Sequence, residues 1–266
     1  MRMLLILLGI AGTLYLLVCL LLYFQQERLL FFPDRLPADY RFRFPGRWQE
    51  RWTTAPDGTR LHGLLFQTDK PRRGLVFYLH GNGGALDSWG DVAPLYTGLG
   101  YDVFLLDYRG YGKSQGQIGS EEQLLRDVEA AYQQLTADYP EAETVVLGYS
   151  LGTGPAAWLA ARHHPRLLIL QAPYYSMVDM ARTHYPWVPG LLVRYPLRTH
   201  EVLPRVQAAV LLFHGEQDEV IYPGSSEKLR ALVPAARLVR LPGAGHNGMT
   251  DNPQYRRELA RVLAGQ

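Results

Sequence analysis

Hydrophobic residues follow three different patterns along this chain, and each pattern predicts a different kind of structure. From Met3 to Phe24 there is no charged residue, and leucine, isoleucine, valine and aromatic residues dominate. As an α-helix these residues would extend about 33 Å, enough to cross a hydrocarbon core of roughly 30 Å. A signal peptide would have a shorter apolar core and a small-x-small cleavage site. We therefore expect an uncleaved single-pass membrane anchor over residues 1–25, with residues 3–24 in the bilayer.

The side of the membrane on which the remaining residues lie stays open at this stage. Arg2 precedes the expected anchor, and several arginines follow it between residues 28 and 43. The positive-inside rule would slightly favour the cytoplasmic side, although arginines in a folded domain need not act as topology signals. Cys19, the only cysteine, lies inside the expected anchor, where we interpret it as a lipid-facing or packing residue.

The second pattern is a regular alternation of strand and helix signals. Residues 26–47 form a basic, aromatic and proline-containing connector, and one domain is expected over residues 48–266. Short apolar runs alternate there with segments of helical apolar spacing, which predicts a mostly parallel sheet with helices on both faces. The expected strands are 61–67, 74–79, 101–106, 144–149, 167–172, 208–213 and 236–241, and the expected helices are 86–99, 121–139, 152–163, 224–233 and 252–264.

The third pattern is an interval that breaks this alternation. Residues 173–206 are rich in aromatic residues and proline, and they lie between two expected strands. A lid over the carboxyl edge of the sheet would be inserted at this point, and the segment is long and aromatic for a minimal crossover. The alternative is a pair of ordinary crossover helices that pack on the sheet.

Composition and charge narrow the function classes. The chain of 266 residues is 47% hydrophobic and 20% charged, as expected for a globular domain with a sizeable core. Its 27 basic residues nearly balance 25 acidic ones, so nothing indicates nucleic acid as a partner. The sequence contains no metal-ligand cluster, and we expect neither a metal nor an organic cofactor. The oligomeric state stays open.

The clearest chemical motif is a Gly-x-Ser-x-Gly turn at residues 148–152. An apolar strand (144–149) precedes it and a run of small helix-forming residues follows it. This order predicts that Ser150 lies at a sharp strand-to-helix corner, with its hydroxyl exposed at the carboxyl edge of the sheet. Gly148 and Gly152 fit such a corner, because it leaves no room for side chains two residues either side of Ser150.

A serine hydroxyl needs a base, and His246 is the best candidate. It follows the expected strand 236–241 in a glycine-containing loop, and imidazole titrates near neutral pH. His80 and His214 occur in His-Gly pairs at strand ends, where a structural role is favoured. We expect the remaining histidines to face solvent; they are His62, His163, His164, His184 and His200.

Asp218 is the best candidate to orient that base. It lies just beyond the strand 208–213, and a carboxylate there could fix the tautomer of His246. Glu216 and Glu219 are close enough in sequence to compete for this role. Ser150, Asp218 and His246 then occur in that order, each after an expected strand, which is more specific than any single motif.

Two backbone N–H groups are candidates for stabilising an oxyanion. The loop His80-Gly-Asn-Gly-Gly84 directly follows the strand 74–79, and we choose Asn82 from it, with Gly83 as the alternative. The second donor would be Leu151, immediately after the nucleophile. A phosphate-binding turn is disfavoured, since no lysine or Ser/Thr follows at Walker spacing.

The loop 107–114 also contains residues that could look catalytic. We expect Asp107 and Arg109 to brace the site through hydrogen bonds instead.

Together these motifs resemble the α/β-hydrolase superfamily, and the resemblance extends from about residue 48 to the end. The motifs are His80-Gly-Asn-Gly-Gly, Asp107-Tyr-Arg-Gly-Tyr-Gly, Gly148-Tyr-Ser-Leu-Gly, His214-Gly-x-x-Asp218 and Gly245-His246. The anchor and the following Gln26-Glu-Arg-Leu-Leu-Phe-Phe-Pro33 are similar to the single-pass membrane-anchored branch, which includes acyl-protein thioesterases and lysolipid hydrolases. The resemblance implies an α/β-hydrolase fold, the triad Ser150, Asp218 and His246, and an oxyanion hole of Asn82 and Leu151.

The sequence therefore predicts a membrane-anchored serine hydrolase that cleaves carboxylic esters or thioesters through an acyl-enzyme. Its substrates would be small or lipid-like acyl compounds presented at the bilayer. One alternative is an aminopeptidase or amidase of the same fold, and another is a catalytically silent binding protein. A dehalogenase or epoxide hydrolase is disfavoured, because those enzymes have a carboxylate nucleophile where this chain has Ser150.

Overall fold

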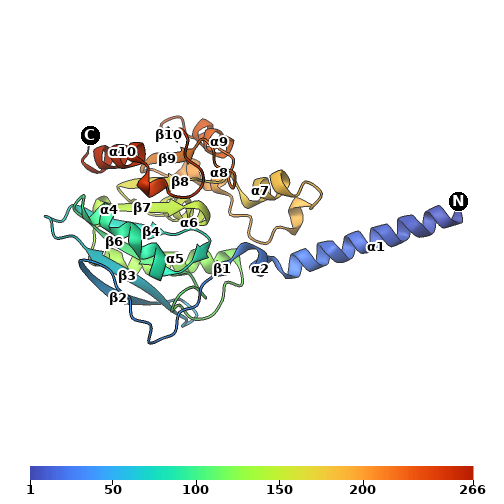
Figure 1. Cartoon of the computed structure of the whole chain (residues 1–266), viewed down its shortest axis with the longest axis horizontal. Coiled ribbons are helices and arrows are strands. Elements are labelled where there is room, and N and C mark those ends of the chain that lie inside the picture. Colours follow the sequence, from blue (N-terminus) through green and yellow to red (C-terminus); the bar gives the residue numbers. More distant parts are fainter. Residues whose placement is uncertain (266) are drawn as a thin grey trace.

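A single long helix, α1 (Arg2–Phe24), projects from one end of the molecule, away from the α/β domain (Figure 1). The computed structural model describes residues 1–265. Only Cys19 of α1 is buried, and the most apolar 18-residue window of the helix has a mean hydropathy of 2.7. By length and composition, α1 is therefore able to cross a membrane.

The domain is built round an eight-stranded sheet with the strand order β10-β9-β8-β7-β4-β6-β3-β2. Neighbouring strands run parallel, except that β3 is antiparallel to both β2 and β6. Every residue of β4, β6, β7 and β8 is buried, which is why these strands are continuous apolar runs in the sequence. The strands are β2 (Arg47–Thr54), β3 (Arg60–Gln67), β4 (Gly74–Leu79), β6 (Tyr101–Leu106), β7 (Thr144–Tyr149), β8 (Leu167–Gln171), β9 (Ala209–Gly215) and β10 (Arg237–Leu241).

Helices cover both faces of the sheet, and the strand residues alternate between the two resulting cores. In β4, for example, Phe77 packs into one core and Tyr78 into the other. The first core is covered by α5 (Glu121–Thr136), α6 (Thr153–Ala160) and α9 (Gly224–Leu232), and the second by α3 (Leu86–Trp89), α4 (Ala93–Thr97) and α10 (Pro253–Leu263). The predicted α/β class, with a mostly parallel sheet between helical layers, is confirmed.

The structure differs from the sequence prediction at two elements. The helix expected over 86–99 is divided into α3, a 3-10 turn (Gly90–Val92) and α4. At this break Gly90 lies against the Phe44 ring, where a β-carbon would come within 2.3 Å of the ring. The strand β2 was not predicted, because it is a mostly polar and only partly buried edge strand.

The connector packs against the domain. It contains α2 (Gln26–Leu30) and a two-residue strand, β1 (Phe32–Pro33), which pairs with β5 (Gly83–Gly84). Phe31 and Phe42 are buried in the two cores. α2, which directly follows α1, is thereby held beside the loop that contains Asn82.

Residues 173–206 form an insertion of short helices between β8 and β9. It contains α7 (Met177–His184), a 3-10 turn (Gly190–Leu192) and α8 (Thr199–Val202). No residue of α7 is fully buried, and α7 lies at the end of the domain from which α1 projects (Figure 1). This is the position that a lid beside the carboxyl edge would occupy.

Candidate active site

Ser150 lies at a strained corner between β7 and α6. Its φ angle is +50°, in the left-handed region that residues other than glycine rarely adopt. A β-carbon on Gly148 would come within 2.4 Å of the Gly152 carbonyl oxygen, and one on Gly152 within 2.1 Å of the Leu79 carbonyl oxygen. Both glycines of the motif are therefore needed for close backbone packing round the serine.

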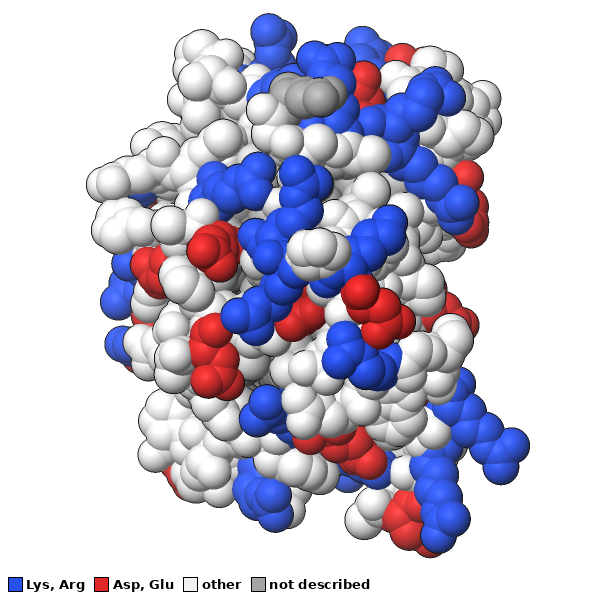
Figure 2. All heavy atoms as spheres, turned by 90° about the vertical axis from the view of Figure 1, so that its left-hand side faces the viewer, with Lys and Arg blue, Asp and Glu red and all other residues white. Residues whose placement is uncertain are grey.

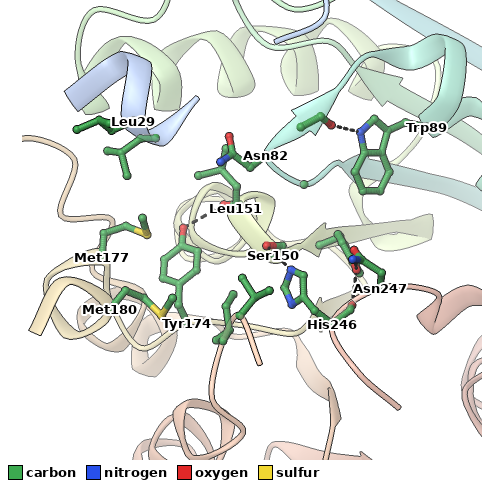
Figure 3. Close-up of a pocket in the computed structure, with 16 residues that line it drawn as sticks. Leu29, Asn82, Trp89, Ser150, Leu151, Tyr174, Met177, Met180, His246 and Asn247 are labelled. Atoms are coloured by element: carbon green, nitrogen blue, oxygen red, sulfur yellow. Dashed lines mark hydrogen bonds between the residues drawn. The ribbon is translucent and has the colours of Figure 1, made fainter. Parts of the chain in front are cut away.

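The structure brings His246 between Ser150 and Asp218, although 96 and 28 residues separate it from them in the sequence. Its Nε2 lies 3.0 Å from Ser150 Oγ (Figure 3). Its Nδ1 lies 2.8 Å from Asp218 Oδ2. Nδ1–H donates to the carboxylate, so Nε2 is left to accept the serine proton. The three side chains thus form one continuous hydrogen-bonded chain.

Asp218 is held as a carboxylate by the residues around it. Its Oδ1 accepts hydrogen bonds from the backbone N–H groups of Val220 (2.9 Å) and Ile221 (2.8 Å), and His214 Nε2 lies 3.3 Å from Oδ2. Burial alone would raise its pKa, but hydrogen bonds from His214, His246 and Ile221 hold the pKa of Asp218 well below its ordinary value. The carboxylate therefore stays charged at neutral pH and can stabilise a protonated His246.

The competing residues occupy other positions. Glu216 and Glu219 are exposed, and Glu216 forms an ion pair with Arg240. In the described part of the chain, no hydrogen bond joins either glutamate to His246. His214 is buried, with Nε2 2.8 Å from the Ile221 carbonyl oxygen, so it bonds to the backbone as expected from the sequence, and the same nitrogen also lies beside Asp218.

The loop after β4 brings Asn82 and Gly83 to the same pocket as Ser150 and Leu151 (Figure 3). Two aromatic residues fix this loop. Tyr111 Oη donates a hydrogen bond to the Asn82 carbonyl oxygen (2.7 Å), and Trp89 Nε1 donates to the Gly83 carbonyl oxygen (2.7 Å). Sequence reasoning did not identify either aromatic residue, because each acts through a contact that has no local motif.

Tyr174 supports the other side of the corner. Its hydroxyl donates to the Leu151 carbonyl oxygen (3.0 Å) and accepts from the Gly154 N–H (3.1 Å). A β-carbon on Gly154 would come within 2.1 Å of that hydroxyl oxygen. Tyr174 therefore fixes the backbone that carries the Leu151 amide, and the sequence showed it only as one aromatic residue of the interval.

The serine opens into a cavity of about 400 Å3 whose outer wall is apolar. Leu29 and Leu30 of α2 form one side, and Met177 and Met180 of α7 form the other (Figure 3). Among the described residues that line the cavity there is no Asp, Glu, Lys or Arg. The cavity is therefore suited to an uncharged, apolar group next to Ser150.

A second cluster of titratable side chains is buried behind the site. Asp107 lies between two histidines: its Oδ2 is 3.7 Å from His62 Nδ1, and its Oδ1 is 3.7 Å from His80 Nε2. Burial raises the pKa of Asp107 to about 6 and lowers the pKa of His80 to about 4. The expectation that His62 faces solvent is wrong, because this residue of β3 is fully buried between Asp107 and Glu50.

Arg109 braces the same region. It forms ion pairs with Asp57 and Asp127, each at 2.7 Å. Neither Asp107 nor Arg109 lines the cavity at Ser150. Arg109 makes the bracing hydrogen bonds expected from the sequence. For Asp107 that expectation is wrong at the side chain, because its carboxyl oxygens have no hydrogen-bond partner among residues 1–265 and only its backbone bonds to Ser114 and His62. Within residues 1–265, no group of three or more His, Cys, Asp or Glu side chains is arranged to hold a metal ion.

Comparison with known proteins places the chain in a family. A family model described as serine aminopeptidase, S33, matches residues 70–199. An α/β-hydrolase domain-containing protein 17C of Xenopus tropicalis is 31% identical over 222 residues, which cover 80% of this chain and 69% of that protein. The chain belongs to the α/β-hydrolase superfamily.

The chain is also similar to one further protein in sequence and to two solved structures in fold. An uncharacterized protein of Mycobacterium tuberculosis is 34% identical over 237 residues, covering 86% of this chain and 83% of that protein. A solved esterase structure from Pyrococcus furiosus has a TM-score of 0.68 at 16% identity, covering 89% of this chain and 97% of that one. A monoacylglycerol lipase structure from Paleococcus ferrophilus has a TM-score of 0.60 at 21% identity, covering 77% and 97% respectively. At these identities the two structures concern the fold alone.

Proposed function

We propose that this α/β hydrolase is a membrane-anchored serine hydrolase that cleaves carboxylic esters or thioesters. The observation that carries the proposal is the hydrogen-bonded chain from Ser150 Oγ through His246 to Asp218. Such a chain activates a hydroxyl that would otherwise be a weak nucleophile. A catalytically silent binding protein would have no need for a serine in a strained backbone conformation beside a positioned base.

The reaction follows from the positions of these atoms. His246 Nε2 takes the proton of Ser150 as Oγ attacks the acyl carbon, and Asp218 stabilises the imidazolium that forms. The N–H groups of Asn82 and Leu151 would hold the oxyanion. His246 then returns the proton to the leaving alcohol or thiol, which leaves an acyl ester on Ser150. Water deprotonated by His246 cleaves this ester and regenerates the serine.

The character of the cavity favours acyl substrates over peptides. An aminopeptidase needs an anionic group to hold the free amine of its substrate, and the described lining residues include no Asp or Glu. Leu29, Met177 and Met180 instead offer an apolar surface to an acyl chain. Although the matching family model is described as serine aminopeptidase, we therefore do not propose a peptide substrate for this chain.

The membrane part of the proposal rests on α1. Its 23 residues are long and apolar enough to cross a bilayer, and 6% of the most apolar window is buried in the molecule. A helix of this composition needs an apolar environment for its exposed surface. Since the cavity is walled in part by α2, which directly follows α1, the anchor would hold the active site close to the membrane surface.

Labelling of the full chain in detergent by a fluorophosphonate tests the proposal. We expect labelling of the wild type, none of Ser150→Ala, and normal labelling of the control Ser88→Ala, whose serine does not line the cavity. A series of esters, thioesters and aminoacyl amides then sorts the substrate classes. Amide cleavage that is faster than ester cleavage would assign the aminopeptidase alternative, and labelling that survives Ser150→Ala would refute the proposed nucleophile.

A further inference from the structure

An uncharged loop follows α7 and is unusually exposed for its composition. Residues 185–193 read Tyr-Pro-Trp-Val-Pro-Gly-Leu-Leu-Val, with no charged side chain. Tyr185 is 58% exposed, Trp187 51% and Leu191 84%. Large apolar side chains exposed together on one loop indicate a surface that contacts something apolar.

The loop lies against the helix that is able to cross a membrane. Tyr15 Oη, in the middle of α1, donates a hydrogen bond to the Trp187 carbonyl oxygen (3.0 Å). Just after the C-terminal end of α1, the side chain of Gln26, the first residue of α2, donates a hydrogen bond to the Leu192 carbonyl oxygen (2.6 Å) and accepts one from the Arg194 N–H (2.8 Å). The loop therefore runs beside the half of α1 nearest the domain, and any bilayer that surrounds this half also reaches the loop.

The first charged residue after the loop is Arg194, near the end of α1 that joins the domain. Arg194 directly follows the loop; its guanidinium lies over the Tyr23 ring at 5.4 Å and pairs with Glu27 at 2.6 Å. Arginine and tyrosine together are typical of the boundary between lipid tails and headgroups. The opposite end of the molecule carries intermingled basic and acidic side chains (Figure 2). Outside α1, three of the exposed large apolar side chains, Tyr185, Trp187 and Leu191, thus lie together on this one loop beside α1.

We infer that the loop 185–193 is a second membrane contact, which places Trp187 and Leu191 in the bilayer that α1 crosses. The inference rests on the membrane anchor of the proposed function. It also implies a path by which the substrate reaches the cavity. The cavity wall is formed by Leu29 and Leu30 of α2 and by Met177 and Met180 of α7. α2 directly follows α1, and α7 directly precedes the loop. The acyl chain of a bilayer-resident ester or thioester therefore enters between these two helices.

Tryptophan fluorescence tests the contact without reference to activity. The chain has five tryptophans, none of them in α1; they are Trp48, Trp52, Trp89, Trp158 and Trp187. We would place the full chain in nanodiscs of phosphatidylcholine with brominated acyl chains, which quench tryptophan in the hydrocarbon region. Wild-type emission should be partly quenched, and Trp187→Phe should lose that quenched component while keeping an apolar side chain. An equal quenched component in both proteins overturns the inference.

A matched pair of exposed leucines tests the route of the substrate. Leu191→Asp should lower turnover of a long-chain ester embedded in the bilayer by about tenfold or more, and leave a soluble short-chain ester unaffected. Leu232 is the last residue of α9 and is 42% exposed. Leu232→Asp, the same change at this site, should alter neither rate. If Leu191→Asp lowers turnover of the two esters equally, or if Leu232→Asp lowers turnover of the long-chain ester as much as Leu191→Asp does, the proposed route is wrong. Conversion of a dimer to a monomer by Leu191→Asp, with no bromolipid quenching, assigns the loop to a second copy and also overturns the inference.

The two tests separate this inference from the proposed function. If the wild type cleaves neither ester, the proposed function fails, and the quenching comparison still decides whether the loop lies in the bilayer.

Discussion

Two buried clusters in this molecule have the same composition, one aspartate between two histidines, and very different properties. Asp218 lies between His214 and His246, while Asp107 lies between His62 and His80. The oxygens of Asp218 accept several hydrogen bonds at 2.8–2.9 Å. Those of Asp107 lie 3.7 Å from both imidazoles and have no hydrogen-bond partner in residues 1–265.

The difference shows that placement, and not composition, decides which cluster can support catalysis. Hydrogen bonds outweigh burial at Asp218 and hold its pKa low, whereas burial dominates at Asp107 and raises its pKa to about 6. The free edge of His246 reaches Ser150 in an open cavity. Among the described residues, the ring nitrogens of His62 and His80 face Asp107, Glu50 and the Gly81 backbone, and both side chains are fully buried, so no substrate atom can approach them.

Removing the proposed nucleophile should separate the two clusters most sharply. Ser150→Ala deletes the hydroxyl through which the first cluster would act, so ester turnover should fall by about 10^4-fold or more. The melting temperature should change little, because only a hydroxyl is lost and the hydrogen bond between His246 and Asp218 remains. Turnover of a chromogenic ester and thermal unfolding measure the two effects. A large fall in melting temperature would mean that Ser150 is structural.

Changing the charge of the first aspartate should have the next largest effect. Asp218→Asn keeps the size of the side chain but removes the charge that stabilises protonated His246. We expect kcat to fall by about 10^3–10^4-fold while KM changes little. Steady-state kinetics on a soluble ester would measure this.

Glu216→Gln is the matched control for Asp218→Asn. It removes a carboxylate two residues away that is exposed and paired with Arg240, so turnover should stay within a few-fold of wild type. If Glu216→Gln lost activity and Asp218→Asn did not, the orienting role would belong to Glu216.

The second histidine of the first cluster should contribute more modestly. His214 donates toward Ile221 and Asp218, so we interpret it as a positioning residue. His214→Phe should lower kcat by about tenfold at constant KM, since it removes a hydrogen bond to a charged group. His214→Gln should recover part of this loss because it restores an N–H donor. A fall in stability in both variants, with kcat unchanged, would mean a purely structural role.

The sequence contained enough information to place the first cluster and too little to place the second. Ser150, Asp218 and His246 each follow a strand of a parallel sheet, and the carboxyl ends of such strands meet at one edge. Local motifs, together with the position of each residue after a predicted strand, were therefore enough to predict that the three side chains lie close together. His62 lies inside a strand that the sequence did predict, but its partners Glu50 and Asp107 are 12 and 45 residues away. No local pattern reports such a contact.

The elements that sequence analysis missed share a physical cause. β2 contains mostly polar residues, since it is an edge strand that pairs with β3 alone among the described strands. The helix predicted over residues 86–99 is interrupted at Gly90 by a contact with Phe44, which is distant in sequence. In both cases tertiary packing outweighs the local signal, whereas the apolar runs of β4 and β7 determine their own burial.

The aspartate of the second cluster should matter for stability and not for turnover. In the unfolded chain Asp107 would titrate near 3.9 and His80 near 6.5. Because folding raises the pKa of Asp107 to about 6, its contribution to stability is present below pH 4 and is lost as pH rises to 6. Because folding lowers the pKa of His80 to about 4, its contribution is present above pH 6.5 and is lost as pH falls to 4.

These two contributions oppose each other between pH 4 and 6, so wild-type stability should vary little there on their account. Asp107→Asn removes only the first, and the free energy of unfolding should then fall more steeply than in the wild type as pH falls from 6.5 to 4. Turnover at neutral pH should stay within a few-fold, since Asp107 does not line the cavity. Denaturant unfolding at several pH values measures the slope. A parallel pair of stability curves, or a loss of turnover as large as that of Asp218→Asn, would contradict the separation of the two clusters.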